Sequence, residues 1–226
     1  MQRDSDTGSD SVDSGSVDSG SVPISEPALD IEERGTLLFA ENELPLSEAE
    51  WRQLEQLVAH SEFEHIVAGD ANESHSVWVS RYFNDISEPV ALNATALAIE
   101  KLLMSEKMRR FYARFTGTPT LCLRRCQANK MTTGDFIGLH RDQDSSPAYY
   151  ATVVFHLDSP YQGGYFETCD QRRYRPDRHM ALVNNCSISH QVTTVESGTR
   201  LTLACFLSRS FAASTNKRYG FKLGRP

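Results

Sequence analysis

The chain has 226 residues, 39% of them hydrophobic, and a formal net charge of −7. This length suits one domain with a buried core and is too short for two full-sized domains. Residues 1–33 hold nine acidic residues and one arginine, so the 22 basic and 21 acidic residues of the remaining chain nearly cancel. That balance argues against a nucleic-acid-binding surface on the folded part.

The first 33 residues include the near-repeat SVDSGSVDSGSV, which is rich in Ser, Gly and Asp. Such a segment buries too little apolar surface to offset the entropy of ordering, so we expect a disordered acidic tail over 1–33 and one domain over 34–226. The tail lacks the basic start and apolar core of a signal peptide, and no stretch approaches the roughly 20 apolar residues of a membrane span. We therefore expect a cytoplasmic protein without a membrane partner. The five cysteines are odd in number and scattered, so we expect them to be free thiols.

Helical patterns fill residues 45–117, after a short predicted strand at 37–39. In LPLSEAEWRQLEQLVAH, Ser47 and Glu50 form a capping-box pattern ahead of apolar residues at helical spacing. A second helical stretch runs from about Pro89 to Phe115, with a possible break near Ser105. Helix-ending residues follow it at 117 and 119.

From Thr120 onward, short β-branched and aromatic runs alternate with turn residues. Eight runs are candidate strands: LCLRRCQA, DFIGLH, YYATVVFHL, GYFET, RRYR, HMALV, SISHQVTTV and TRLTLACFL. That density predicts a mainly β fold with flanking helices, and its core over about 120–208 suits a double-stranded β-helix, or jelly roll.

GDFIGLHRDQD contains the pair of residues that most resembles a metal site. On an extended strand His140 and Asp142 would point to the same face, and His190, on another predicted strand, could supply a third ligand. Two histidines and one carboxylate leave about three coordination positions open, as in non-heme Fe(II) oxygenases, whereas structural zinc wants four protein ligands. Arg200 follows, after a turn expected at 196–198, and a guanidinium in this apolar strand needs an anionic partner, best a carboxylate.

Together the H-x-D pair, the Gly163-Gly164 turn, the distal histidine and the arginine ten residues beyond it resemble the iron(II)- and 2-oxoglutarate-dependent dioxygenase superfamily, in its prolyl 4-hydroxylase-like branch. The resemblance covers about 120–208 and implies a jelly-roll fold. It implies that His140, Asp142 and His190 hold Fe(II), that Arg200 holds the distal carboxylate of 2-oxoglutarate, and that dioxygen is the second cosubstrate.

Other candidate residues have weaker patterns. Met131 stands where the family often has a tyrosine that contacts 2-oxoglutarate, so Arg124, Gln127 and Asn129 become candidates for a further contact, with ordinary polar residues as the alternative reading. A second H-x-D pair, His156 and Asp158, is expected at a strand end away from iron. Asp144, Tyr149 and Phe166 are candidate substrate contacts, with a solvated loop or core packing as the alternatives. Four histidines without a partner pattern are expected on the surface: His60, His65, His75 and His179.

The resemblance predicts an enzyme that hydroxylates an unactivated C–H bond. Related halogenases replace the metal-binding carboxylate with a small residue, so Asp142 favours hydroxylation. The compact, near-neutral core favours a small-molecule substrate, a free amino acid or similar polar metabolite, with a protein side chain such as proline as the alternative. Nucleic acid is disfavoured as a substrate because Phe206 stands where that branch has a second arginine. A non-catalytic, cupin-like metal-binding module is the alternative from another class, and the oligomeric state stays open.

Overall fold

The computed structural model describes residues 29–70, 72–84, 90–118, 120–158 and 160–210. Most of the predicted tail, residues 1–28, lies outside these ranges, as do Pro89 and Pro119. The described fold starts before the predicted boundary at 34. A short helix, α1 (Ile31–Arg34), is capped by the side chain of Asp30, and the Ile31 side chain is completely buried in the main core.

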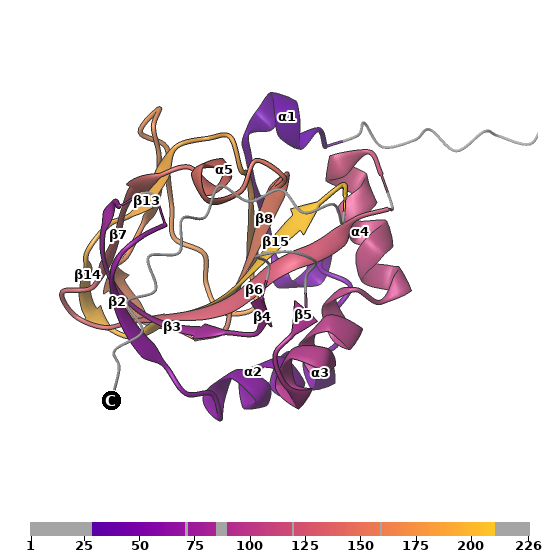
Figure 1. Ribbon diagram of the computed structural model, residues 1–226, viewed down its shortest axis with the longest axis horizontal. Coiled ribbons are helices and arrows are strands. Elements are labelled where there is room, and N and C mark those ends of the chain that lie inside the picture. Colours follow the sequence, from indigo (N-terminus) through magenta and orange to yellow (C-terminus); the bar gives the residue numbers. More distant parts are fainter. Residues whose placement is uncertain (1–28, 71, 85–89, 119, 159, 211–226) are drawn as a thin grey trace, which may run out of the picture.

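A strongly curled antiparallel sheet organises the molecule (Figure 1). One side of the curl pairs six long or medium strands in the order β1 (Thr36–Phe39), β12 (Ala181–Asn185), β8 (Ala151–His156), β15 (Arg200–Ser208), β6 (Cys122–Met131) and β3 (Ser74–Arg81). β3 also pairs with β7 (Phe136–His140), the first strand of the other side. That side continues with β13 (His190–Val192), β10 (Phe166–Thr168) and β11 (Arg173–Tyr174). This arrangement confirms the expected mainly β, jelly-roll core.

Shorter strands complete the sheet and its edges. β2 (Glu64–Ala68) pairs with β3, β9 (Tyr161–Gly163) with β14 (Val195–Gly198), and β4 (Phe83–Asn84) with β5 (Val90–Ala91). All eight predicted runs contain a strand, whereas the β2–β3 hairpin was not predicted. The expected turn at 196–198 is wrong, because these residues belong to β14, which pairs with β9 and ends at Gly198, whose φ is +80°.

The helices cover the outer face of the larger side of the sheet. α2 (Glu48–Ala59) begins at the predicted capping box, since Ser47 and Glu50 bond each other's backbone amides. The second helical stretch divides near Ser105, as predicted, into α3 (Ala94–Leu103) and α4 (Glu106–Thr116). It begins later than predicted, because the side chain of Asn93 caps α3 and the residues before it form β5.

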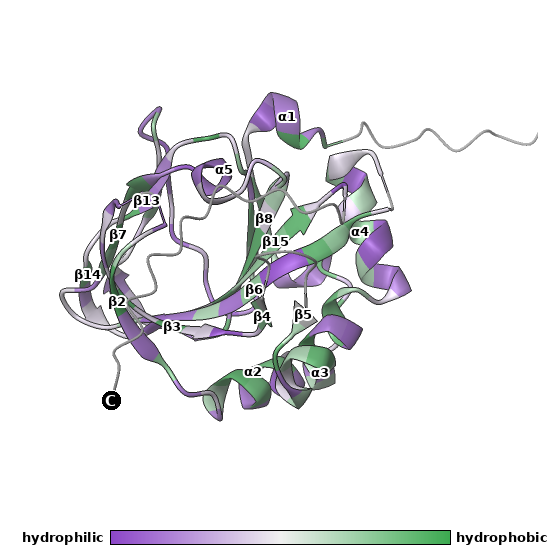
Figure 2. Ribbon diagram, viewed as in Figure 1, coloured by the Kyte–Doolittle hydropathy of each residue, from purple (hydrophilic) through white to green (hydrophobic). Residues whose placement is uncertain are grey.

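Among the described residues, the two larger of three hydrophobic cores lie on opposite faces of this sheet. The larger one joins the helices to β6, β8, β12 and β15 through residues such as Trp51, Phe115 and Phe155. Figure 2 shows the matching hydrophobic colour along β8 and β15, and a hydrophilic stretch on β6. The smaller of the two lies inside the curl and includes Met131 and Val192. Inward side chains that do not join this inner core line the pocket described below.

Two further predictions concern cysteines and membranes. All five cysteines are free thiols, as expected, and only Cys169 is exposed. Among the described residues, no helix is both long and apolar enough to span a membrane.

Candidate metal centre and adjoining pocket

Three of the predicted residues come together inside the curl. Possible ligand atoms of His140, Asp142 and His190 all lie within 4.8 Å of one another. Nε2 of His140 is 3.5 Å from Oδ1 of Asp142, and Nε2 of His190 is 3.9 Å from the same oxygen. No other group of three such residues occurs among the described parts of the chain. One small, buried set of two imidazoles and one carboxylate is therefore available to hold an ion.

Strand pairing brings the two histidines together. His140 ends β7, His190 begins β13, and the two are direct partners in the antiparallel register. Nδ1 of His140 contacts the carbonyl oxygen of Gly138 at 2.8 Å, and Nδ1 of His190 contacts that of Ile188 at 3.0 Å. A carbonyl only accepts, so each Nδ1 carries the hydrogen, and Nε2 is the nitrogen that each ring turns toward Asp142 and can offer to a metal.

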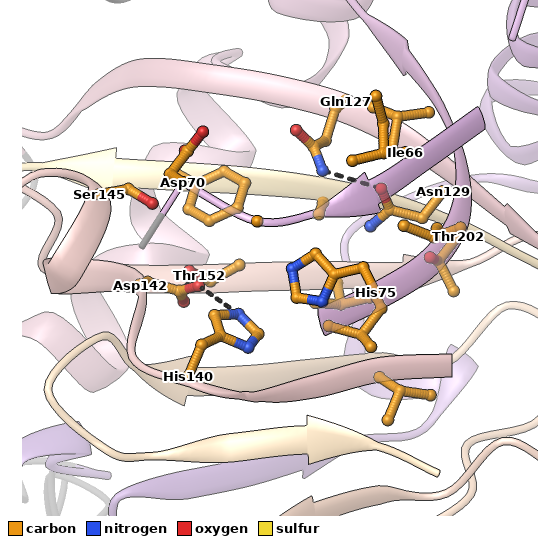
Figure 3. Close-up of a pocket in the computed structure, with 18 of the residues that line it drawn as sticks. Ile66, Asp70, His75, Gln127, Asn129, His140, Asp142, Ser145, Thr152 and Thr202 are labelled. Carbon is orange, nitrogen blue, oxygen red and sulfur yellow. Dashed lines mark hydrogen bonds and ion pairs between the residues drawn. The ribbon is translucent and has the colours of Figure 1, made fainter. Parts of the chain in front are cut away.

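Asp142 reaches the cluster in another way than predicted. It does not continue the strand of His140 but opens a single helical turn, α5 (Asp142–Ser145). The hydroxyl of Thr152 on β8 donates to its Oδ2 at 2.5 Å, which leaves Oδ1 facing the histidines. The strand-alternation argument was therefore wrong, although it selected the right pair, since a turn after β7 folds the carboxylate back (Figure 3).

The electrostatics of the cluster favour an ionised carboxylate. Burial acts to raise the pKa of Asp142, but the charges of His190 and His140 and hydrogen bonds from His140 and Thr152 hold that pKa below its usual value. Burial acts to lower the pKa of His140, and its contact with Asp142 raises it overall. Burial lowers the pKa of His190. An anionic oxygen beside two imidazoles is a donor set that suits Fe(II) and leaves open positions.

Arg200 lies deep in the same pocket, 2% exposed, at the start of β15. Its Nη1 is 3.7 Å from the sulfur of Met131, the residue at the position where a tyrosine was expected. Burial lowers the pKa of Arg200, against the effect of the nearby Tyr161 hydroxyl. The Gly163–Gly164 turn makes room for this side chain. Both glycines have positive φ, and a Cβ at Gly164 would lie 3.2 Å from Cδ of Arg200.

Several polar atoms beside Arg200 have no hydrogen-bond partner among the described residues. They are Nε of Arg200, Oγ1 of Thr202 and both ring nitrogens of His156, all fully buried. His156 does end β8, as expected, and is not part of the metal cluster. Buried polar groups normally find partners, so this corner of the pocket is suited to a polar ligand.

The three candidates on β6 divide between its two faces. Gln127 and Asn129 line the pocket, and Nε2 of Gln127 donates to Oδ1 of Asn129 at 2.8 Å (Figure 3). Arg124 is completely buried but is absent from the pocket lining, and it lies where the β6–β15 register shifts. Arg125, which was not predicted, lines the pocket instead. Arg125 alternates with Gln127 and Asn129 along β6 and so shares their inward face, whereas Arg124 points the other way.

The candidate substrate contacts have separate outcomes. The ring of Phe166 lines the pocket and stacks on His190, with ring centroids 4.8 Å apart. Tyr149 is completely buried against Phe206, outside the pocket lining. Asp144 forms an ion pair with Arg141 at 2.7 Å and likewise does not line the pocket. Contacts with neighbouring side chains thus explain the positions of Tyr149 and Asp144 without a bound substrate.

Two histidines expected on the surface are partly buried. His75, on β3, lines the pocket with its ring centroid 5.6 Å from that of His140, and its Nε2 is 3.2 Å from Glu73. His179 stacks on Trp51, and each of its ring nitrogens contacts a glutamate. The alternating pattern SHSVWVSR could have revealed β3 and with it the inward place of His75.

Comparison with known proteins agrees with the fold and the metal cluster. The model of the 2OG-Fe(II) oxygenase superfamily matches residues 126–208. A 2OG-Fe(II) oxygenase family oxidoreductase from Burkholderia pseudomallei is 30% identical, with a TM-score of 0.72 over 81% of this chain and 89% of that one. No curated protein matches the chain. The chain therefore belongs to the 2OG-Fe(II) oxygenase family, whose metal is Fe(II) and whose cosubstrate is 2-oxoglutarate.

More distant structures share the fold alone. A prolyl-4-hydroxylase from Pseudomonas putida is 17% identical, with a TM-score of 0.56 over 81% of this chain and 97% of its own. The epimerase SnoN from nogalamycin biosynthesis is 13% identical, with a TM-score of 0.63 over 86% of each chain. Because a hydroxylase and an epimerase resemble this chain comparably, the fold does not decide the reaction.

Proposed function

We propose that the protein is an Fe(II)- and 2-oxoglutarate-dependent hydroxylase of a small polar molecule, a free amino acid or a similar metabolite. The observation that carries this proposal is the shared pocket, in which the cluster of His140, Asp142 and His190 and the buried Arg200 line the same cavity. In this proposal His140, Asp142 and His190 hold the iron, and Arg200 holds the distal carboxylate of 2-oxoglutarate.

The residues present fit both groups. Two imidazole nitrogens and one carboxylate oxygen suit Fe(II) while leaving positions for 2-oxoglutarate and dioxygen. Arg200 Nε and Thr202 Oγ1 are buried donors without a partner among the described residues, and a carboxylate can accept from both. When bound, iron and 2-oxoglutarate supply the oxidation: dioxygen converts 2-oxoglutarate to succinate and carbon dioxide and gives its second oxygen atom to a C–H bond.

The protein's own contribution is to orient these groups. The Nδ1 bonds to the carbonyls of Gly138 and Ile188 fix both imidazole rings, and Thr152 fixes Asp142. Stacking of Phe166 on His190 covers one side of the cluster with an apolar ring. Asp142 also supports hydroxylation over halogenation, because its carboxylate fills the coordination position that a halide would need.

A chain of polar side chains along the pocket supports a polar substrate. Nη1 of Arg125 pairs with Asp70 at 2.8 Å, Nε of Arg125 donates to Gln127 at 2.8 Å, and Gln127 donates to Asn129. Figure 3 shows Asp70, Gln127 and Asn129 on the side of the pocket opposite His140. Groups of both charge signs and two amides at the pocket wall suit a small molecule with charged and hydrogen-bonding groups.

The test is succinate formation by protein purified without oxygen and then given Fe(II), 2-oxoglutarate, oxygen and a panel of free amino acids. We expect at least one amino acid to raise succinate well above the uncoupled background and to gain one oxygen atom, measured by mass spectrometry. The control is Asp142→Ala, which should give neither product. Oxidation of proline-containing peptides but of no free compound would favour the protein-hydroxylase alternative. Metal binding without any 2-oxoglutarate turnover would favour a non-catalytic module.

A further inference from the structure

The unpartnered atoms beside Arg200 lie on one inward-facing patch of two paired strands. Thr202 on β15 and His156 on β8 are direct partners in the antiparallel register, and Arg200 stands two residues before Thr202 on the same face. Thr152 and Val154, which alternate with His156 along β8, both line the pocket and fix the direction in which this face points. The side chains of Arg200 and Thr202 therefore line one corner of the pocket, and His156 is buried next to them on the same inward face.

This corner is rich in donors and, among the described residues, holds no anionic acceptor. His156 is 1% exposed, and neither ring nitrogen has a partner among the described residues. Nε of Arg200 and Oγ1 of Thr202 are likewise buried without a hydrogen-bond partner among the described residues. Among the described residues, the guanidinium interacts with the Tyr161 hydroxyl and the Met131 sulfur, neither of which is an anion. Unsatisfied buried groups of this kind are costly, and a ligand with several acceptor sites would satisfy them together.

We propose that His156 is a third anchor for the distal carboxylate of 2-oxoglutarate and donates one ring N–H beside Arg200 and Thr202. This rests on the proposed function, and it extends the anchor to a histidine that the sequence pattern placed outside the site. The two oxygens of a carboxylate offer about four lone-pair sites, enough for a guanidinium, a hydroxyl and an imidazole. His156 is a positioning residue, because it holds the end of 2-oxoglutarate that does not react.

The imidazole acts here in its neutral form. Burial, aided by the charge of Arg200, lowers the pKa of His156 well below its usual value. A neutral His156 still donates one hydrogen bond, so the one positive charge of Arg200 balances the one negative charge of the distal carboxylate. The consequence is selectivity. His156 should favour 2-oxo acids that carry this carboxylate and have little effect on those that lack it.

The experiment measures binding, with two acids that differ only at the distal end. Protein loaded with Mn(II) in place of Fe(II), without oxygen, is titrated by calorimetry with 2-oxoglutarate and with 2-oxopentanoate, whose methyl group replaces that carboxylate. Because a hydrogen bond to a charged group is lost, His156→Phe should weaken 2-oxoglutarate binding roughly ten- to hundredfold. Binding of 2-oxopentanoate should change by less than about threefold. Of His156→Asn and His156→Gln, which place an amide N–H near one or the other ring nitrogen, at least one should recover most of the loss.

Several outcomes would overturn the assignment. Unchanged 2-oxoglutarate affinity in His156→Phe would remove His156 from the anchor, and equal losses for both acids would show a merely structural role. If His156→Phe does not fold, as judged by circular dichroism, His156→Leu takes its place and its affinities for the two acids are compared in the same way. Wild-type protein that binds neither acid would instead contradict the proposed function, so failure of the two ideas can be told apart.

Discussion

Asp142 is the residue on which the proposed metal site depends most. It is the one anionic ligand, and its oxygen faces both histidines at 3.5 and 3.9 Å. Asp142→Ala should lower substrate oxidation at least about a hundredfold, beyond the ten- to hundredfold that changes in outer-shell partners usually cost. Initial rates of succinate formation measure this. Asp144→Asn is the matched control, because that neighbouring carboxylate pairs with Arg141 outside the pocket lining. A comparable loss in the control would point away from metal ligation.

Thr152 is expected to act through Asp142. Its hydroxyl holds the carboxylate oxygen that faces away from the histidines. Thr152→Val keeps the shape and removes that bond, so Fe(II) affinity should fall roughly tenfold or more. Thr152→Ser keeps the hydroxyl and should stay near wild type. Anaerobic metal titration distinguishes the two variants, and equal affinities would remove Thr152 from its role.

Individual residues were selected from the sequence where their chemistry is distinctive, and missed where the direction of a side chain decides. Two histidines, a carboxylate and a distant arginine form a distinctive set, and the structure brings these four to one pocket although Asp142 lies on a helical turn instead of the expected strand. Arg124 was chosen over Arg125, although Arg125 is the arginine that alternates with Gln127 and Asn129 along β6. His156 was set aside because a sequence pattern does not show which pocket a strand end faces.

At the scale of elements, the β3–β7 pair sets the position of the metal cluster. A Cβ at Gly138 would lie 2.3 Å from the backbone oxygen of Ser74, and the carbonyl of Gly138 also orients His140. Gly138→Ala should therefore separate the two strands and destabilise the fold by about 1–3 kcal/mol, as overpacking usually does.

Chemical denaturation of the metal-free protein measures this cost. Leu139→Ala is a suitable control, because that side chain is 57% exposed and surface changes usually stay within about 0.5 kcal/mol. Equal stability of Gly138→Ala and wild type would mean that β3 and β7 do not approach each other as described.

Predictability of the elements followed their burial pattern. Most strands after Thr120 have apolar residues at regular positions and were located, whereas β9 was not predicted and residues 196–198 of β14 were expected to form a turn. β2 was missed because its sequence lacks the alternation of apolar and polar residues that marks a half-buried strand. In the structure, accordingly, none of its side chains is fully buried. The longer helices α2, α3 and α4 were located by their caps and apolar faces, with the start of α3 misplaced, whereas α1 and α5 were not predicted.

At the scale of the whole molecule, buried neutral histidines should make stability depend on pH. Burial, aided by Arg200, lowers the pKa of His156 far below the roughly 6.5 expected in the unfolded chain. Below about pH 6.5 the unfolded state binds a proton at this histidine that the native state does not bind. The free energy of unfolding is therefore highest above about pH 6.5 and falls as the pH drops below it.

Removing the histidine should remove its share of this dependence. Between about pH 6 and 5, His156→Phe should lose less stability than wild type, by up to roughly 1.4 kcal/mol per pH unit for one proton. Urea unfolding of the metal-free proteins at several pH values gives the comparison. Parallel pH profiles would show that His156 is protonated or exposed in the native state.

The central claim is that one pocket holds both iron and 2-oxoglutarate. It is tested most directly by adding 2-oxoglutarate to the Fe(II)-loaded protein without oxygen and recording visible absorption, because chelation of Fe(II) by a 2-oxo acid produces a charge-transfer band. The wild type should develop this band and saturate at one 2-oxoglutarate per chain. Arg200→Ala should need roughly a hundredfold more 2-oxoglutarate, since a charge-assisted pair is lost. The same band in a His140→Ala, His190→Ala double variant, or no band in the wild type, would contradict the claim.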